Sequence, residues 1–431
     1  MKLTKEKITK VSSLKKEPKW MLDFRLKAYD KFISLDNPDF GPKLDIDFNN
    51  LTYYKKIDEA KTDWKDVDKE VKETFKNLGV ISAEEKYLEG VNNQLESEVI
   101  YHNLRKDAKE SGVIFLSTDD ALKKYPELFK KYFNKLVDYS ENKYTALNGA
   151  MWSGGSFIYI PPNTKLDRPL QSYFRINSVT MGQFERTIII VDENSELTYI
   201  EGCTAEEYAE DSLHAGVVEI FVLKNAKCRY ITIQNWSKDV YNLVTKRSIV
   251  SENGKMEWID GNIGSKVTMK YPSSILKGDY SSSSSISIAY AKDSQVLDAG
   301  AKMIHLGKNT KSNIISKSIA SSGGTSNYRG TVKISNGAEN SEAIVKCDTI
   351  LLDNKSKSDT FPKNIVLNDS SSLEHEATVS KISEEKLNYL KSKGISEDAA
   401  SELIVMGFIA DFKKELPLEY AIELNRLLKI N

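Results

Sequence analysis

Three thiols are the groups in this chain with the most distinctive chemistry. Cys203, Cys228 and Cys347 lie far apart, and an odd number without the spacing of a disulfide framework predicts reduced thiols in a cytoplasmic protein. Cys347 follows Lys346 in a run typical of a strand, and a cation beside a thiol favours the thiolate that binds iron or carries sulfane sulfur. The alternative for any single cysteine is a buried structural thiol.

A second group of reactive side chains follows Cys347 by about 29 residues. Glu374, His375 and Glu376 are consecutive, and carboxylate and imidazole are competent iron ligands. Ligation by fewer than four cysteines leaves an assembling iron-sulfur cluster labile enough to be handed on. We therefore expect Cys347, Glu374, His375 and Glu376 to be candidate cluster ligands. The alternative is an exposed polar turn that leads into a helix start.

The other candidate thiol is Cys203, and pairs of residues two positions apart in the sequence lie in the strands predicted near it. Cys203 follows Gly202, which allows close backbone approach. Residues two apart on a strand face the same way, so Arg175 pairs with Asn177, and Gln234 with Trp236. Such a face is either a satisfied hydrogen-bond network, which is the safer interpretation, or a lined passage. The two remaining candidates, His214 and His305, are expected to be packed histidines rather than ligands.

Several common catalytic motifs are missing from the sequence. The run from Gly307 to Ser312 has the residue types of a phosphate-binding loop in the wrong order. There is no C-x-x-C, H-E-x-x-H or G-x-S-x-G. The chain is therefore not expected to hydrolyse ATP alone, to hold a self-contained zinc site or to act as a serine hydrolase.

Short β-branched runs dominate residues 141–378 and must position these side chains. Turn-forming asparagines recur near a 28-residue period, at Asn194, Asn225, Asn253, Asn309 and Asn336. Without helices between the strands, this period predicts a β-solenoid whose coils bury one another's faces. A two-sheet sandwich is the alternative.

Helices are expected on both sides of this core. Residues 1–140 form a predicted N-terminal helical region, with helices near 20–33, 64–77 and 118–134 and a longer one from Ser82 to about Glu110. Residues 379–431 form a C-terminal helical region. There Gly394 ends one helix, Ser396 caps the next and Pro417 begins a third, whose apolar side contains Leu418, Ile422 and Leu427.

The overall charge argues against two classes of partner. Sixty-one basic and 62 acidic residues leave a formal net charge of -1, so no nucleic acid or anionic membrane partner is expected. The lysine-rich N-terminus lacks the apolar region of a secretory signal. The longest apolar run, Leu403 to Ala410, is too short to span a bilayer.

Six motifs together resemble the SufB branch of the SufB/SufD family. They are Ser97 to His102, Glu201 to Ala205, Asn242 to Arg247, Lys270 to Ser273, Lys302 to Ser312 and Glu374 to Thr378. The resemblance runs from about residue 82 to the C-terminus. It implies a mainly β protein, with a right-handed parallel β-helix flanked by N-terminal and C-terminal α-helical regions.

The resemblance also implies a function in the SUF system. It implies a non-enzymatic scaffold that accepts sulfane sulfur and iron and builds a transient cluster, 4Fe-4S or 2Fe-2S, for transfer to apoproteins. Cys347, with Glu376 and His375, matches the cluster site, and Cys203 matches the point where sulfur enters. Arg175, Asn177, Gln234, Trp236 and Lys246 match positions along a route between the two thiols.

The implied partners supply what the chain lacks. A SufC-like ABC ATPase binds the C-terminal helices and hydrolyses ATP in trans. A SufD-like paralogue completes a complex of one SufB, one SufD and two SufC, with a homodimer as the other arrangement. A cysteine desulfurase with its sulfur-transfer protein delivers sulfur, and a reduced flavin is a further candidate component.

One motif departs from the family pattern, and two other functions compete. Glu206-Glu207 follows Glu201 to Ala205 where the family often has proline, which puts the docking surface of the sulfur donor in doubt. A polysaccharide lyase or esterase on the same architecture would need an array of acidic residues that is not evident. A SufD-like structural partner would not need Cys347 together with Glu374 to Glu376.

Overall fold

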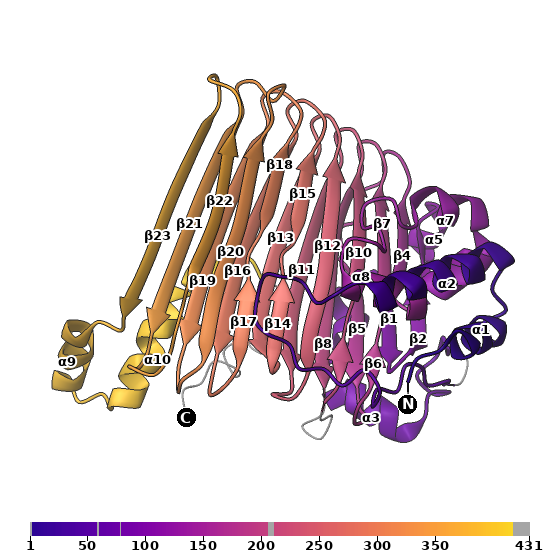
Figure 1. Ribbon diagram of the computed structural model, residues 1–431, viewed down its shortest axis with the longest axis horizontal. Helices are drawn as coiled ribbons and strands as arrows, with labels where there is room; N and C mark the ends of the chain where they lie inside the picture. The colour runs from indigo at the N-terminus through magenta and orange to yellow at the C-terminus, as the bar shows by residue number, and fades with distance from the viewer. Residues whose placement is uncertain (1, 58–59, 78, 206–210, 417–431) are drawn as a thin grey trace.

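A β-solenoid forms the centre of the computed structural model, which describes residues 2–57, 60–77, 79–205 and 211–416 (Figure 1). Its strands run side by side from the N-terminal to the C-terminal end in two facing sheets. Each coil contributes strands to both sheets and pairs in parallel with the next coil, which confirms the predicted solenoid over the sandwich.

The first sheet contains, in spatial order, β2 (Glu98–Leu104), β1 (Gly90–Leu95), β5 (Leu170–Ile176), β8 (Glu196–Ala205), β11 (Lys227–Trp236), β13 (Lys255–Gly264), β16 (Ser282–Ala291), β19 (Lys311–Ala320), β21 (Glu342–Leu351) and β23 (Ser372–Lys381). The main path of the second sheet contains β14 (Val267–Lys270), β17 (Val296–Ala299), β20 (Thr325–Ile334), β18 (Lys302–His305), β15 (Ser273–Leu276), β12 (Tyr241–Val250), β10 (Val217–Val222), β7 (Arg186–Val191), β4 (Ser156–Ile160) and β3 (Ile114–Ser117). Three strands branch from this path: β6 (Gly182–Gln183), β9 (Leu213–His214) and β22 (Thr360–Val366).

Asparagines in the left-handed region turn the corners of the coils, as the sequence predicts. Asn194, Asn225, Asn253 and Asn309 have φ angles of 59°, 55°, 53° and 55°. Asparagine tolerates this conformation better than most residues. The side-chain amide of Asn225 donates to Oδ1 of Asn194 at 2.9 Å, so successive corners also bond to each other. The predicted corner at Asn336 is wrong by a few residues, because Asn340 takes the left-handed conformation there, with φ 55°.

The N-terminal region is mainly helical and lies beside one end of the solenoid (Figure 1). Its helices are α1 (Lys5–Leu14), α2 (Lys19–Ser34), α3 (Lys69–Asn77), α4 (Val80–Tyr87), α5 (Lys106–Glu110), α6 (Thr118–Lys124), α7 (Pro126–Tyr132) and α8 (Lys143–Met151). The predicted helices near 20–33 and 118–134 are confirmed, the latter as α6 and α7. The helix predicted over 64–77 is shorter, beginning at Lys69.

The long helix predicted from Ser82 to Glu110 is wrong. Ser82 lies inside α4 and is not its cap, and the chain then forms the hairpin of β1 and β2. The parallel pairing of β1 with β5 extends the first sheet and overrides the local helical pattern.

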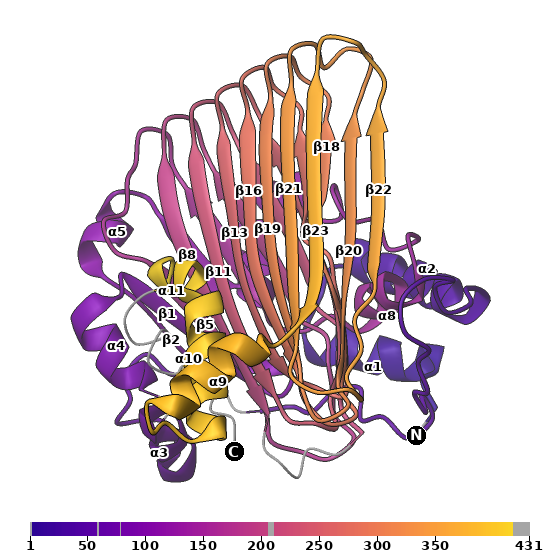
Figure 2. The ribbon, with the colours of Figure 1, turned by 90° about the vertical axis from the view of Figure 1, so that its left-hand side faces the viewer.

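The C-terminal helices are α9 (Glu384–Ser392), α10 (Glu397–Phe408) and α11 (Ala410–Lys414). Gly394 follows α9 with φ 83°, and the hydroxyl of Ser396 caps α10 by accepting from the amide of Ala399, as predicted. Figure 2 shows α10 and α11 lying across the first sheet, where Val405 and Phe412 pack on isoleucines of its outer face. The predicted third helix at Pro417, with Leu418, Ile422 and Leu427, lies outside the described residues. Within them, no helix combines the length and the apolarity needed to cross a bilayer.

Candidate functional site

Cys203 points into the solenoid from β8 and is completely buried. Gly202 faces the other way, where an added Cβ would lie 2.5 Å from the ring of Tyr173, so this position requires the close approach that only glycine permits. In register, Cys203 lies beside Gln234 of β11, and Trp236 packs in the same apolar cluster. Glu206 and Glu207, the departure from the family pattern, lie outside the described residues.

Two buried N–H groups near Cys203 have no hydrogen-bond partner among the described residues. They are Nε2 of Gln234 and Nε1 of Trp236. Buried donors are normally paired, since an unmade hydrogen bond costs about 1–3 kcal/mol. The pair therefore marks a place where a ligand with lone pairs, such as a sulfur anion, would be stabilised.

An ion pair lies next to the thiol inside the solenoid. Nζ of Lys246 contacts Oε1 of Glu201 at 3.3 Å, and neither side chain is exposed. The thiol of Cys203 lies 3.8 Å from the same oxygen, and the hydroxyl of Tyr230 donates to Oε2. Burial, reinforced by Glu201, raises the pKa of Cys203 well above its ordinary value, against the opposing effect of Lys246.

A second buried ion pair continues this network toward the C-terminal end. Nζ of Lys270 contacts Oδ1 of Asp260 at 2.8 Å and donates to Oε1 of Gln234 at 3.2 Å and to Thr232 at 3.3 Å. Burial on its own would raise the pKa of Asp260, but Lys270 and Lys246 outweigh it and hold that pKa below its ordinary value. The interior thus keeps charged groups, which costs stability unless each group is paired.

The polar side chains form a continuous row along the first sheet. In the register of the strands, Glu201, Thr232, Asp260, Ser287, Ser316 and Cys347 are successive neighbours. All six side chains are buried. Five strand-to-strand steps at about 4.8 Å place Cys203 and Cys347 about 24 Å apart along the stack.

Cys347 and His375 face each other at the far end of this row. Sγ of Cys347 in β21 lies 3.9 Å from Nε2 of His375 in β23, and Nδ1 of His375 contacts the side-chain amide of Asn364 at 3.0 Å. Burial lowers the pKa of His375, so the imidazole is neutral at neutral pH and able to ligate a metal. A ring held through its second nitrogen is typical of histidine ligands.

The thiol of Cys347 is protonated in this chain. Burial raises its pKa to about 12; the hydroxyl of Tyr328 works against burial and Asp348 adds to it. Gly330 leaves room for that hydroxyl, because an added Cβ would lie 2.3 Å from it. The expectation that Lys346 favours the thiolate is wrong: adjacent strand residues point to opposite faces, and Lys346 reaches Glu376 on the outer face at 3.9 Å.

The structure does not bring Glu374 and Glu376 to the thiol. Both are exposed and pair in register with the outward residues Ile344 and Lys346, whereas His375 pairs with the inward Val345. Of the predicted ligands, Cys347 and His375 therefore share one face and the two glutamates share the other. Among the described residues, no group of three or more potential metal ligands converges.

Arg175 and Asn177 lie on a different face from the thiol they were expected to serve. Nε of Arg175 donates to Oδ1 of Asn177 at 2.7 Å, so the predicted pair is present. Nη1 of Arg175 also donates to Thr204 at 3.1 Å, its partner in register. Because Thr204 directly follows Cys203, this pair lies on the outer face of the sheet while Cys203 points inward.

Cys228, His214 and His305 are structural. Cys228 packs in the apolar cluster that fills the solenoid, and burial raises its pKa. His305 contacts Thr310 at 2.7 Å and Ser312 at 2.9 Å, and His214 lies between Asn242 at 2.9 Å and Glu185 at 2.8 Å. Both are packed histidines, as expected.

Sequence reasoning missed the groups that connect the two thiols. They are Glu201, Tyr230, Thr232, Asp260, Lys270, Ser287, Ser316 and Tyr328. Two-residue steps back from Cys203 to Glu201, and from Gln234 to Thr232, would have found the first of them. The later ones follow only from the register between strands.

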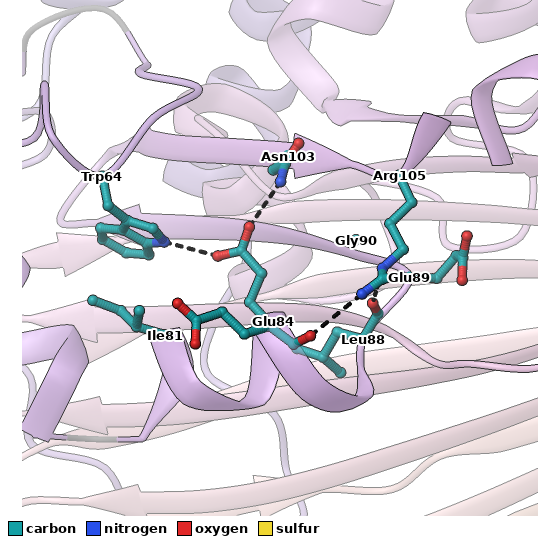
Figure 3. A pocket seen from close by; sticks show the side chains of 9 residues that line it. Trp64, Ile81, Glu84, Leu88, Glu89, Gly90, Asn103 and Arg105 are labelled. Atoms are coloured by element: carbon teal, nitrogen blue, oxygen red, sulfur yellow. Dashed lines mark hydrogen bonds between the residues drawn. The ribbon is translucent and has the colours of Figure 1, made fainter. Parts of the chain in front are cut away.

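A separate pocket of about 310 Å³ lies between α4 and the hairpin of β1 and β2 (Figure 3). The carboxylate of Glu84 accepts from Nε1 of Trp64 at 2.7 Å and from the amide of Asn103 at 2.8 Å, and Arg105 donates to the carbonyl of Leu88 at 3.1 Å. None of the candidate sulfur or iron groups is among its lining residues.

Comparison with known proteins shows which family the chain is related to. Residues 174–408 match the family described as "SUF system FeS cluster assembly, SufBD core domain", and residues 60–172 match "SufBD protein N-terminal region". Proteins of Staphylococcus epidermidis, Staphylococcus aureus and Staphylococcus haemolyticus, each named an iron-sulfur cluster assembly SufBD family protein, are 56% identical over 429 residues. These alignments cover 99% of this chain and 92% of each relative. With both family regions matched and the solenoid in place, the chain belongs to the SufBD family of iron-sulfur cluster assembly proteins.

Proposed function

We propose that this protein is the scaffold subunit of a SUF complex, which accepts sulfane sulfur and iron and builds a nascent cluster at Cys347 for transfer to apoproteins. The observation that carries the proposal is the buried row of polar side chains that ends at Cys347 and begins beside Cys203. A structural partner without a sulfur role would not need two thiols joined by such a row. A buried polar row of this kind costs stability unless every group is paired, so its presence favours a functional role.

Sulfur enters this scaffold at Cys203. The unpaired donors of Gln234 and Trp236 and the ammonium of Lys246 supply the hydrogen bonds and the positive charge that a persulfide needs in an interior closed to water. Arg175 and Asn177, on the outer face, hold the end of β5 against β8 and position this strand end. The donor is a cysteine desulfurase with its sulfur-transfer protein.

Iron and sulfur meet at Cys347 and His375. These two side chains lie between the last strands of the first sheet, so a partner that pairs with β23 brings its own ligands within reach. A SufD-like paralogue is the proposed partner, with a second copy of this chain as the alternative. Glu374 and Glu376 can join the site only if β23 slips by one residue, because such a slip exchanges the two faces of a strand.

The ATPase docks on the C-terminal helices and supplies nucleotide hydrolysis in trans. Tyr389 of α9 and Leu403 of α10 are exposed apolar side chains on this region, and exposed apolar groups on a helical cap favour a protein partner. We place the complex in the cytoplasm, where the three free thiols stay reduced.

The test is anaerobic cluster assembly on the purified complex with its ATPase and paralogue partners. Iron, sulfide content and the visible spectrum are measured for the wild type, for Cys347→Ser and for the matched control Cys228→Ala. The scaffold function requires that Cys347→Ser lose the cluster while the complex stays assembled and Cys228→Ala keep it. Full cluster occupancy in Cys347→Ser would refute it.

A further inference from the structure

Glu201 and Cys203 lie two residues apart on β8 and therefore project into the same part of the interior. The thiol donates to Oε1 of Glu201 across 3.8 Å. The hydroxyl of Tyr230 donates to the other oxygen, so the carboxylate is held with Oε1 toward the sulfur. Lys246 contacts the same Oε1, and its ammonium also lies over the ring of Tyr230, 4.5 Å from the centroid.

The reaction proposed for Cys203 requires the proton of its thiol to leave. Only a thiolate attacks a persulfide efficiently. Burial, Glu201 and Glu185 together keep this thiol protonated well above the ordinary pKa of cysteine. Because the side chain is fully buried, bulk water cannot take the proton directly.

We propose that Glu201 is the proton acceptor that activates Cys203 for sulfur transfer, an inference that rests on the proposed entry of sulfur at Cys203. The thiol proton moves to Oε1 of Glu201, and the resulting thiolate attacks the outer sulfur of a donor persulfide. The S–S bond of the donor breaks as a new S–S bond forms on Cys203. The inner sulfur of the donor leaves as a thiolate and takes up the proton of the transferred S–H, so the donor departs as a thiol and Cys203 is left as an anionic persulfide. The exchange needs no external oxidant or reductant.

Charge conservation within the cluster explains why this acceptor suits the site. Before transfer, Lys246 is paired with the carboxylate of Glu201; afterwards, it faces a neutral acid and an anionic sulfur close to the same oxygen. The buried cluster keeps its net charge, which avoids the large cost of adding an unpaired charge to an interior of low dielectric. Glu201 thus accepts the proton, and Lys246 then stabilises the anionic persulfide on Cys203.

None of the other titratable groups around Glu201 is placed or protonated to accept the proton of Cys203. Lys270 is paired with Asp260 at 2.8 Å, and Glu185 with His214 at 2.8 Å. Tyr199 and Tyr230 are phenols whose pKa burial raises well above the ordinary value, so neither accepts a proton at neutral pH. Glu201 is the carboxylate in contact with the thiol within the described part of the chain.

The test measures persulfide loading of the full-length chain by cysteine hydropersulfide. Intact-protein and peptide mass spectrometry follow the gain of one sulfur at Cys203 from about pH 6 to about pH 9. In Glu201→Gln we expect loading to slow on the order of a hundredfold at neutral pH and to rise again with pH, since the fraction of thiolate at Cys203 increases as the pH approaches the pKa of the thiol. Glu257→Gln, which removes a partly buried carboxylate that pairs with Arg229 and does not touch the thiol, is the control and should load at close to the wild-type rate.

A further variant separates chemistry from folding. Glu201→Gln leaves Lys246 buried without its partner, so Glu201→Gln/Lys246→Met removes both charges and should fold normally while loading at least as slowly as the single variant. Wild-type loading rates and an unchanged pH profile in either folded variant would overturn the role of Glu201. Absence of any loading at Cys203 in the wild type, or equal loading of the Cys203→Ala chain, would instead overturn the proposed sulfur entry.

Discussion

Ser316 and Cys347 are direct neighbours in the register of β19 and β21, and both side chains point into the solenoid. Ser316 follows Ser287 and Asp260 in the same row, so the hydroxyls connect the charged groups near Cys203 to the second thiol. No member of this row between Glu201 and Cys347 is a cysteine, and Cys228 pairs in register with Leu197 and Met256 outside it. The sulfur path that we propose therefore has no protein thiol as carrier between its ends.

Removing the two hydroxyls should block cluster formation after sulfur has entered. In Ser287→Ala/Ser316→Ala, we expect persulfide loading of Cys203 to be unchanged and cluster sulfide at Cys347 to fall about tenfold, because an anionic sulfur species loses two hydrogen-bond donors. Sulfide and iron analysis of the reconstituted complex measures this. Ser285→Ala changes an inward serine of the same strand outside the row and is the control; an equal loss there would argue against a directional path.

His375 should be required for the cluster in the observed register of β23. We expect His375→Gln to lose most bound iron while the complex stays assembled, because the amide replaces a neutral imidazole 3.9 Å from the thiol. Iron content and spectra of the complex test this. The comparison is Glu376→Gln: a loss as large as that of His375→Gln would indicate that β23 shifts by one residue in the assembled complex.

Tyr328 should control the reactivity of Cys347. Its hydroxyl works against the burial that raises the pKa of this thiol to about 12, so Tyr328→Phe should raise that pKa further. A hydroxyl that can donate to the thiolate stabilises it by about 1.5–3 kcal/mol, so its removal predicts alkylation of Cys347 at least about tenfold slower at a given pH. Peptide mass spectrometry after timed iodoacetamide treatment measures the rate. Tyr290→Phe, which removes a buried hydroxyl bonded to Ser321, should leave it unchanged.

The N-terminal region should depend on one buried glutamate for its attachment. Glu219 of β10 accepts from the backbone amides of residues 134–137 and pairs with Arg186 at 2.9 Å, with neither side chain exposed. Glu219→Gln leaves Arg186 uncompensated and should lower the free energy of unfolding by roughly 3–5 kcal/mol. Urea denaturation measures this loss. Glu257→Gln, which removes a partly exposed pair, should cost less than about 1 kcal/mol.

Acid should weaken the solenoid through His305. Burial lowers the pKa of this imidazole from 6.5 to about 4, so the unfolded chain binds a proton at pH 5 that the folded chain does not. Stability is therefore lost as the pH falls through 6.5, by about 2 kcal/mol between about pH 8 and about pH 5 from this group. Denaturant unfolding at both values, compared with His305→Gln, isolates the contribution. If His305→Gln shows the same pH dependence of stability as the wild type, other groups cause the loss of stability in acid.

The sequence by itself determined the repeat and the alternation of side chains. Both are local properties: asparagine tolerates the left-handed corners, and residues two apart share a face of a strand. These properties were enough to predict the solenoid, the terminal helices and the shared face of Gln234 and Trp236. The local pattern after Ser82 predicted a long helix, and this prediction was wrong because β1 pairs with β5 there.

Only the tertiary structure decided which residues meet. The register between coils made Glu201 a neighbour of Thr232 and Ser316 a neighbour of Cys347, although they are about 30 residues apart in the chain. It also separated His375 from Glu374 and Glu376, and Arg175 from Cys203, by putting them on opposite faces of the sheet. Register depends on the packing of whole coils against one another, and no short motif contains that information.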